Sequence, residues 1–144
     1  MMKKWLLAGA MIVAASGVFA AGDPIAERKE ILKGFGDLTK PNGAALKGEA
    51  AFDLAKAQAA LKAYSEGSKK LVSLFPDTSK TGGKTEALPS IWENKAKFDG
   101  IYAKLDKDAA DALAVIKDEA SFKANFGKVL GNCKACHDDF REKK

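Results

Sequence analysis

Apolar side chains recur at helical spacing along almost the whole chain after residue 23. The first stripe consists of four apolar residues, Ile31, Leu32, Phe35 and Leu38. Asp23 and Pro24 precede this stripe, and these two residue types are favoured at a helix N-cap and first turn. The turn-forming residues 41–43 follow it. The pattern therefore predicts a first helix that begins at Pro24 and ends at Pro41.

Three further helical segments follow. The second is rich in alanine and runs from about residue 49 to residue 75, where Pro76 stops it. Residues 76–88 have turn composition and form the longest connection. A third helix is predicted to start at Pro89, and a fourth near Ala120. Four amphipathic helices without strand-like alternation predict an all-α fold, an antiparallel four-helix bundle.

The N-terminal 20 residues are typical of a secretory signal peptide. Lys3 and Lys4 precede an apolar run over 5–18, and residues 18–20 resemble a cleavage site. The run is short for a membrane span, which needs about 20 residues, although an uncleaved anchor is the alternative. We therefore expect 1–20 to be removed and 21–144 to be one domain in the periplasm, with no membrane segment in the mature form.

Charge adds little to this picture. The whole chain carries a formal net charge of +5, and without Lys3 and Lys4 the 22 remaining basic residues face 19 acidic ones, a net charge of +3. No long block of one sign suggests a nucleic-acid partner. No paired carboxylates and no nucleophile-base arrangement stand out, so we do not expect an enzyme.

The chemistry of the chain is concentrated in the run Cys133-Lys134-Ala135-Cys136-His137. It contains both cysteines and the single histidine, in the C-x-x-C-H order that attaches a c-type haem. On a helix the three side chains share one face, so two thioethers and an axial histidine can serve one haem. A structural zinc site wants four ligands, and a thioredoxin-like pair expects a βαβ unit. A simple disulfide is the remaining alternative.

A count of possible ligands predicts the coordination of the iron. All three methionines lie within residues 1–20, and His137 is the only histidine. Electron-transfer cytochromes c commonly use His and Met together. Lysine or the new N-terminal amine could substitute, but both are mostly protonated at neutral pH. The sequence therefore predicts a five-coordinate, high-spin iron with one open face.

The chain resembles cytochrome c′, the four-helix-bundle c-type cytochromes with haem near the C-terminus. The resemblance covers residues 24–144, and its most specific stretches are 133–141, 87–92, 74–76 and 52–53. It implies one haem c per chain, held by Cys133 and Cys136, with His137 on the iron. It also implies a homodimer formed through the first two helices.

The resemblance further implies a set of haem-pocket residues: Arg28, Lys29, Leu32, Phe75, Glu86 and Arg141. Arg28 would lie near the haem propionates, Leu32 over the open iron face, and Phe75 in the distal wall. Glu86 would lie near the haem edge and Arg141 by the proximal face. Lys29 departs from the glutamine of some relatives. Both arginines are also compatible with ordinary solvated surface charges.

We therefore expect a periplasmic haem protein that binds small gases such as NO and CO. Ferrous haem binds both gases. An anion should bind poorly next to an apolar leucine, because the leucine does not compensate the hydration that the anion loses. The alternative is an electron-transfer cytochrome with an unforeseen sixth ligand. Slow electron exchange with a periplasmic redox partner is compatible with either function.

Overall fold

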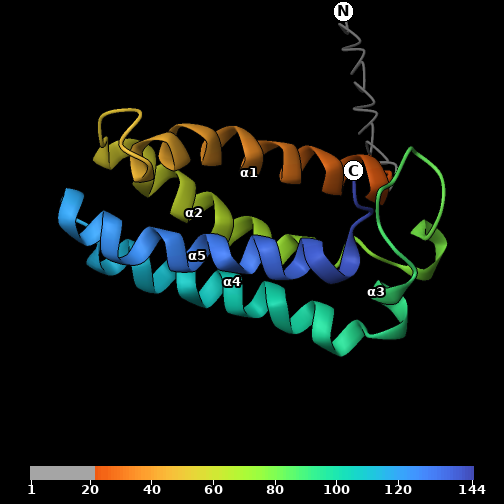
Figure 1. The fold of residues 1–144 in the computed structure, drawn as a ribbon. Helices are drawn as coiled ribbons and strands as arrows, with labels where there is room; N and C mark the ends of the chain where they lie inside the picture. Colours follow the sequence, from red (N-terminus) through yellow and green to blue (C-terminus); the bar gives the residue numbers. More distant parts are fainter. Residues whose placement is uncertain (1–21) are drawn as a thin grey trace, which may run out of the picture.

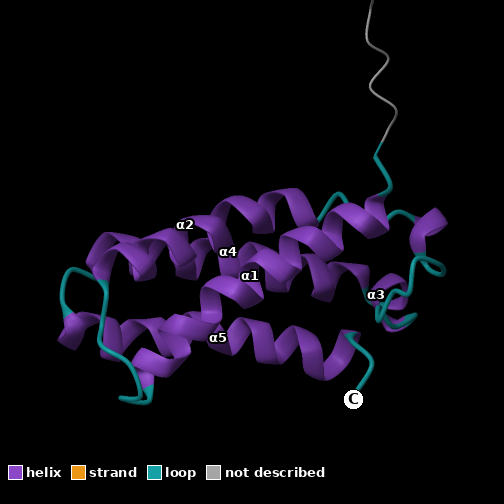
Figure 2. Ribbon diagram, turned by 90° about the horizontal axis from the view of Figure 1, so that it is seen from above, coloured by secondary structure: helices purple, strands orange, loops and turns teal. Residues whose placement is uncertain are grey.

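A computed structural model describes residues 22–144, so the predicted signal peptide lies outside the described residues. Four long helices form an antiparallel bundle, with the connections at its two ends (Figures 1 and 2). Its elements are α1 (Pro24–Leu46), α2 (Leu54–Leu71), the short 3-10 helix η1 (Asp77–Ser79), α3 (Ser90–Glu93), α4 (Lys95–Val115) and α5 (Glu119–Phe140). The predicted fold class is confirmed. None of these helices is long and apolar enough to cross a membrane.

Three of the long helices begin at an aspartate whose side chain accepts a backbone N–H of the first turn. Asp23 accepts from Ile25 N at 2.9 Å, and Asp53 accepts from Lys56 N at 3.1 Å. Asp118 and Ser121 form a reciprocal capping box at the start of α5. These caps satisfy donors that would otherwise lack partners, so local sequence fixes where three helices start.

The prediction that Pro41 ends the first helix is wrong, because α1 continues to Leu46. Asn42 and Ala45 are buried against the rest of the bundle. The Asn42 amide donates to the carbonyl of Leu38 at 2.8 Å and to that of Lys56 at 3.2 Å, just inside α2. The free energy gained from this packing and from the two Asn42 hydrogen bonds exceeds the loss of the one backbone hydrogen bond that Pro41 cannot donate.

Two other boundaries also differ from the prediction. The second helix is shorter than 49–75, because Asp53 caps it at its start and a turn follows Leu71. The third is split into α3 and α4 at Asn94, whose backbone leaves the helical region with φ −126° and ψ 49°. Pro89, expected to start the third helix, is the residue before α3.

Aromatic side chains fill the centre of the bundle: Phe35, Tyr64, Phe75, Phe98, Tyr102, Phe122, Phe126 and Phe140 are all buried. The main packed pairs are α1 with α2, α2 with α4, and α4 with α5. At the α1–α2 contact a Cβ on Gly67 would lie 2.6 Å from the Phe35 ring. This glycine therefore sets a close approach of the two helices.

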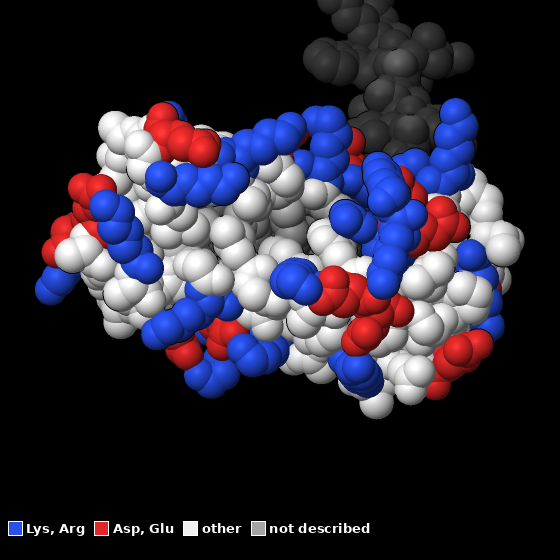
Figure 3. Space-filling model, viewed as in Figure 1, with Lys and Arg blue, Asp and Glu red and all other residues white. Residues whose placement is uncertain are grey.

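Helices α1 and α5 do not form a closely packed pair in the described part of the chain. The space-filling view shows a hollow on this face, between α1 and α5, with lysine and arginine side chains gathered at its side (Figure 3). The C-x-x-C-H run lies on α5. The fold thus leaves an open space beside α5, the helix that carries the residues expected to bind haem.

Candidate functional site

Cys133, Cys136 and His137 lie in the last two turns of α5, and all three are half-buried. Neither cysteine is in a disulfide. The residue before them, Asn132, is buried and donates to Asp108 Oδ2 on α4 at 2.8 Å. Cys136 packs against the apolar core. These contacts fix the rotation of α5, and they place the three side chains at i, i+3 and i+4 on one face.

Burial determines the protonation of this group. It raises the pKa of the Cys136 thiol to about 12, with smaller contributions from Cys133 and Asp139, and it also raises the pKa of Cys133. It lowers the pKa of His137, and the Arg141 charge lowers it further. Neutral thiols are poor metal ligands and slow redox groups, whereas a neutral imidazole has the lone pair that an iron needs.

These features fit a haem and disfavour the alternatives. No group of three His, Cys, Asp or Glu side chains able to hold a bare metal ion occurs among residues 22–144. The described chain also has no βαβ unit for a thioredoxin-like pair. Two thiols and a neutral histidine on one face of α5, a helix that borders the hollow of Figure 3, are the set that covalent haem attachment requires.

The α1 residues expected in the pocket have very different surroundings. Leu32 is half-buried and packs against the core. Lys29 is exposed, and its Nζ donates to the Gly83 carbonyl at 2.9 Å. Arg28 is only 2 % exposed, so it is not an ordinary solvated charge. Burial lowers its pKa, with Tyr102 and Asp23 opposing this effect.

Phe75 lies directly beneath Arg28. Its ring centroid is 4.4 Å from the guanidinium carbon, a cation–π geometry. Phe75 is buried, and its carbonyl accepts a hydrogen bond from Trp92 Nε1 at 2.9 Å. The structure therefore gives Phe75 an apolar contact with the core and a direct contact with Arg28.

Glu86 and Arg141 lie where the end of α5 meets the connection 76–88. Residues Ala87 and Arg141 form an antiparallel bridge, and Glu86 pairs with Lys144 at 3.0 Å. The Lys144 hydrogen bond lowers the pKa of Glu86, and Arg141 and Lys29 add to this effect. Arg141 is exposed, and its Nη1 is 3.5 Å from His137 Nε2. The structure thus brings Arg141 next to His137.

Tyr102 on α4 is a further candidate residue, which the sequence pattern assigns only to an apolar stripe. It is 5 % exposed and its ring packs edge-on against Phe98 at 5.1 Å. Burial raises the pKa of its phenol, and the proximity of Cys136 and Cys133 raises it further. The phenol therefore lies near the motif. A tyrosine at a position otherwise suited to phenylalanine was the only signal.

A four-helix bundle with a C-x-x-C-H run on its last helix defines a c-type cytochrome of the bundle class. The family model for Cytochrome C′ matches residues 23–141. The chain accordingly belongs to the cytochrome c′ family, and it binds covalently attached haem c.

Individual relatives agree with this assignment. The chain is 58 % identical to a cytochrome c′ of Rhodopseudomonas palustris over 138 residues, which cover 96 % of this chain and 94 % of the relative. A solved structure of cytochrome c′ from that organism is 63 % identical, with a TM-score of 0.82, and covers 85 % of this chain and 98 % of its own. A cytochrome c-556 of the same organism is 35 % identical over 148 residues, covering 100 % and 99 % of the two chains.

Proposed function

We propose that this protein is a periplasmic haem protein with a five-coordinate, high-spin iron that binds small uncharged gases such as NO and CO. Residues 1–20 would be a cleaved signal peptide and 21–144 the single haem-binding domain. It would act by binding rather than as an enzyme. The ferrous haem would supply the affinity for the gas, and the protein would control what reaches the open axial position.

The observation that carries this proposal is the lack of the two usual sixth ligands, methionine and a second histidine. Outside residues 1–20 the sequence has no methionine, and His137 is its only histidine. The position expected over the open face is Leu32, whose hydrocarbon side chain cannot coordinate a metal. In the methionine-ligated relatives the distal ligand comes from this first helix, so the leucine favours an open iron.

The other side chains have complementary tasks in the proposal. Cys133 and Cys136 would form the two thioethers, and His137 would ligate the iron on the side of α5. Leu32 and Phe75 would make the other side apolar, so that an anion would lose hydration there without compensation. Glu86 would lie at the haem edge and Arg141 by the proximal face, with Arg28 near the propionates and Lys29 next to it on α1.

The decisive measurement is an optical spectrum of the reduced holo-protein, matured with haem-attachment machinery, before and after NO is added. A broad Soret band that changes with NO would support the proposal. Sharp α and β bands that NO does not change would overturn it, because they require a sixth ligand. The mass of the mature protein, equal to that of 21–144 plus one haem, would test the cleavage site and the two thioethers together.

Removal of the leucine side chain tests the distal wall. Leu32→Ala should speed CO association with the reduced protein, because the smaller side chain obstructs the open face less. The matched control is Leu46→Ala, which removes the same atoms from a half-buried position at the other end of α1. Flash photolysis would measure both rates. Equal rates in the two variants would show that Leu32 does not control access.

An electron-transfer role is the second candidate. The specific observation in its favour is the 35 % identity to a cytochrome c-556 along the whole chain. Such a function would need a sixth ligand from a lysine or the N-terminal amine, which the same spectrum would reveal. A redox partner that keeps the haem reduced is compatible with both candidates.

A homodimer is part of the proposal, and a surface groove supports it. The groove lies between α1 and α2 and is lined mainly by small and apolar residues, Ile31, Gly34, Phe35, Leu38, Ala63, Glu66, Gly67 and Lys70. A second copy of the chain would cover this surface. Sedimentation of the holo-protein over a range of concentrations would test it, and a monomer at all concentrations would exclude it.

A further inference from the structure

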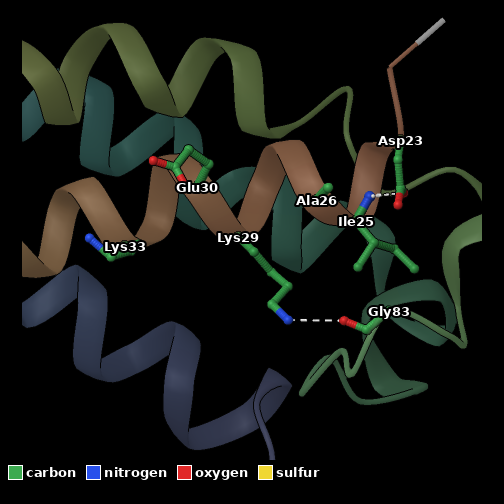
Figure 4. A pocket seen from close by; sticks show the side chains of 7 residues that line it. All are labelled: Asp23, Ile25, Ala26, Lys29, Glu30, Lys33 and Gly83. Atoms are coloured by element: carbon green, nitrogen blue, oxygen red, sulfur yellow. Dashed lines mark hydrogen bonds between the residues drawn. The ribbon is translucent and has the colours of Figure 1, made fainter.

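Residues 77–88, which we call the strap, are bound to the first turns of α1. Arg28 donates to Ser79 Oγ at 2.8 Å, to the Ser79 carbonyl at 3.0 Å and to Thr85 Oγ1 at 2.9 Å. Lys29 Nζ donates to the Gly83 carbonyl at 2.9 Å, and Ile25 lies so close that a Cβ on Gly83 would be 2.8 Å from it (Figure 4). The strap is thus fastened to α1 by side chains.

The other end of the strap is bound to the end of α5. Leu88 N donates to the Phe140 carbonyl at 3.0 Å, and Glu142 N donates to the Glu86 carbonyl at 2.8 Å. The Glu86–Lys144 ion pair adds a side-chain contact at the same place. The residues that make these bonds, Phe140, Glu142 and Lys144, follow His137 by three, five and seven positions along the chain. The strap is therefore fastened to α5 mainly by backbone.

The strap connects two helices that otherwise lack close packing with one another. The α1 helix carries Leu32, one turn after Arg28, and α5 carries His137. Each of these helices packs on a different partner, α1 on α2 and α5 on α4. At this end of the hollow, the distance between α1 and α5 is consequently set through the strap.

Arg28 has almost no donor capacity left for another task. Its Nη1 donates to the Leu74 carbonyl and Ser79 Oγ, and its Nη2 to the Ser79 carbonyl and Thr85 Oγ1. These bonds use all four terminal N–H groups, which leaves Nε–H alone without a partner among the described residues. A lysine has one donor atom and cannot reproduce this fork.

We propose that Arg28 is a positioning residue, which clamps the strap to α1 and thereby holds Leu32 at its working distance from the wall that carries His137. This inference rests on the proposed function, since it gives Arg28 control of gas access through Leu32. Because the other donors of Arg28 are bound already, only its Nε–H would remain to bind the haem propionates near which this residue is expected.

Two variants test the clamp in the reduced holo-protein. Arg28→Gln removes all four hydrogen bonds that the guanidinium donates. Thr85→Val removes only the hydrogen bond that Thr85 Oγ1 accepts from Arg28, together with the one that the same oxygen accepts from Ala87 N. Lys62→Gln, an exposed cation on α2, is the matched control. Hydrogen exchange of peptides covering 77–88, followed by mass spectrometry, reports the strap, and flash photolysis of the CO form reports access.

Arg28→Gln should speed exchange in the strap by at least about tenfold, because bonds from a charged donor are the stronger kind. It should speed CO association several-fold, while Thr85→Val should change both quantities in the same direction by less. If Arg28 acts through Leu32, adding Arg28→Gln to Leu32→Ala should give little further acceleration.

Three results would overturn the inference. Exchange in the strap equal to that of Lys62→Gln would show that Arg28 does not clamp it. Faster exchange with an unchanged CO rate would show that the clamp does not position Leu32. An undiminished effect of Arg28→Gln in the Leu32→Ala background would place its action elsewhere. Failure of the proposed function is recognised separately, as a wild-type protein whose spectrum does not respond to NO or CO.

Discussion

The close approach of α1 and α2 at Gly67 makes a prediction about stability. Gly67→Ala would place a Cβ 2.6 Å from two atoms of the Phe35 ring and 3.2 Å from Ile31 Cγ2. Non-bonded carbon atoms essentially never lie as close as 2.6 Å, so one of the two helices or the Phe35 ring must move. The ring cannot turn away easily, because it packs edge-on against Tyr64 with centroids 5.2 Å apart.

The magnitude follows from two opposing effects. Alanine in place of glycine inside a helix stabilises by about 1 kcal/mol. Overpacking a filled contact costs about 1–3 kcal/mol. Gly67→Ala should therefore lose up to about 2 kcal/mol of unfolding free energy. Gly100→Ala lies in α4 with nothing within 4 Å of the added Cβ. It has the gain in helix propensity without the clash, so its free energy of unfolding should rise by up to about 1 kcal/mol.

Guanidinium unfolding of the holo-proteins, followed by far-UV circular dichroism at one concentration, would measure both variants. Their difference isolates the clash, since the helix-propensity gain is common to both. Phe35→Leu should remove most of the Gly67→Ala penalty by shortening the side chain that it meets. Equal stabilisation by the two alanines would refute the close contact, and with it the reason for a glycine at this position.

Two further predictions concern Asp108, which joins α4 to α5, and the proline inside α1. Hydrogen bonds from Lys104 and then Asn132 hold the pKa of Asp108 below its usual value. Its stabilising effect should therefore be complete above the ordinary aspartate pKa and disappear as pH falls through the lower folded value. Asp108→Asn should flatten the dependence of the unfolding midpoint on pH below about pH 4, and parallel curves would contradict this. Pro41→Ala should raise the guanidinium midpoint, because it restores an N–H that can reach the Asp37 carbonyl inside α1; a lower midpoint would mean that the rigidity of proline in the unfolded chain dominates.

The helices and the motif could be read from the sequence because their signals are local. Helical spacing of apolar residues identified four long helical segments, and the aspartate at residue 23 marked the start of one. Cys133, Cys136 and His137 stand close enough along the chain that helical geometry alone puts them on one face. The resemblance to cytochrome c′ added the pocket residues, and the family is confirmed.

What sequence reasoning missed depends on contacts between distant segments. Pro41 predicts a helix end because the effect of a proline on the backbone is local, whereas Asn42 binds a carbonyl of α2 that no local pattern reveals. The break at Asn94 was likewise not foreseen. Tyr102 looked like core, since the position of its phenol near Cys136 depends on how α4 packs against α5.

The helical fold, the haem-binding motif and the shortage of axial ligands are all predictable from the amino-acid sequence, because each depends on spacing or on counts of residue types. How these parts are arranged with respect to one another depends instead on tertiary packing. Packing buries Arg28, binds the strap between α1 and α5, and leaves a hollow beside α5. Such arrangements arise when side chains far apart in the chain compete for the same space and the same hydrogen-bond acceptors, which no local pattern records.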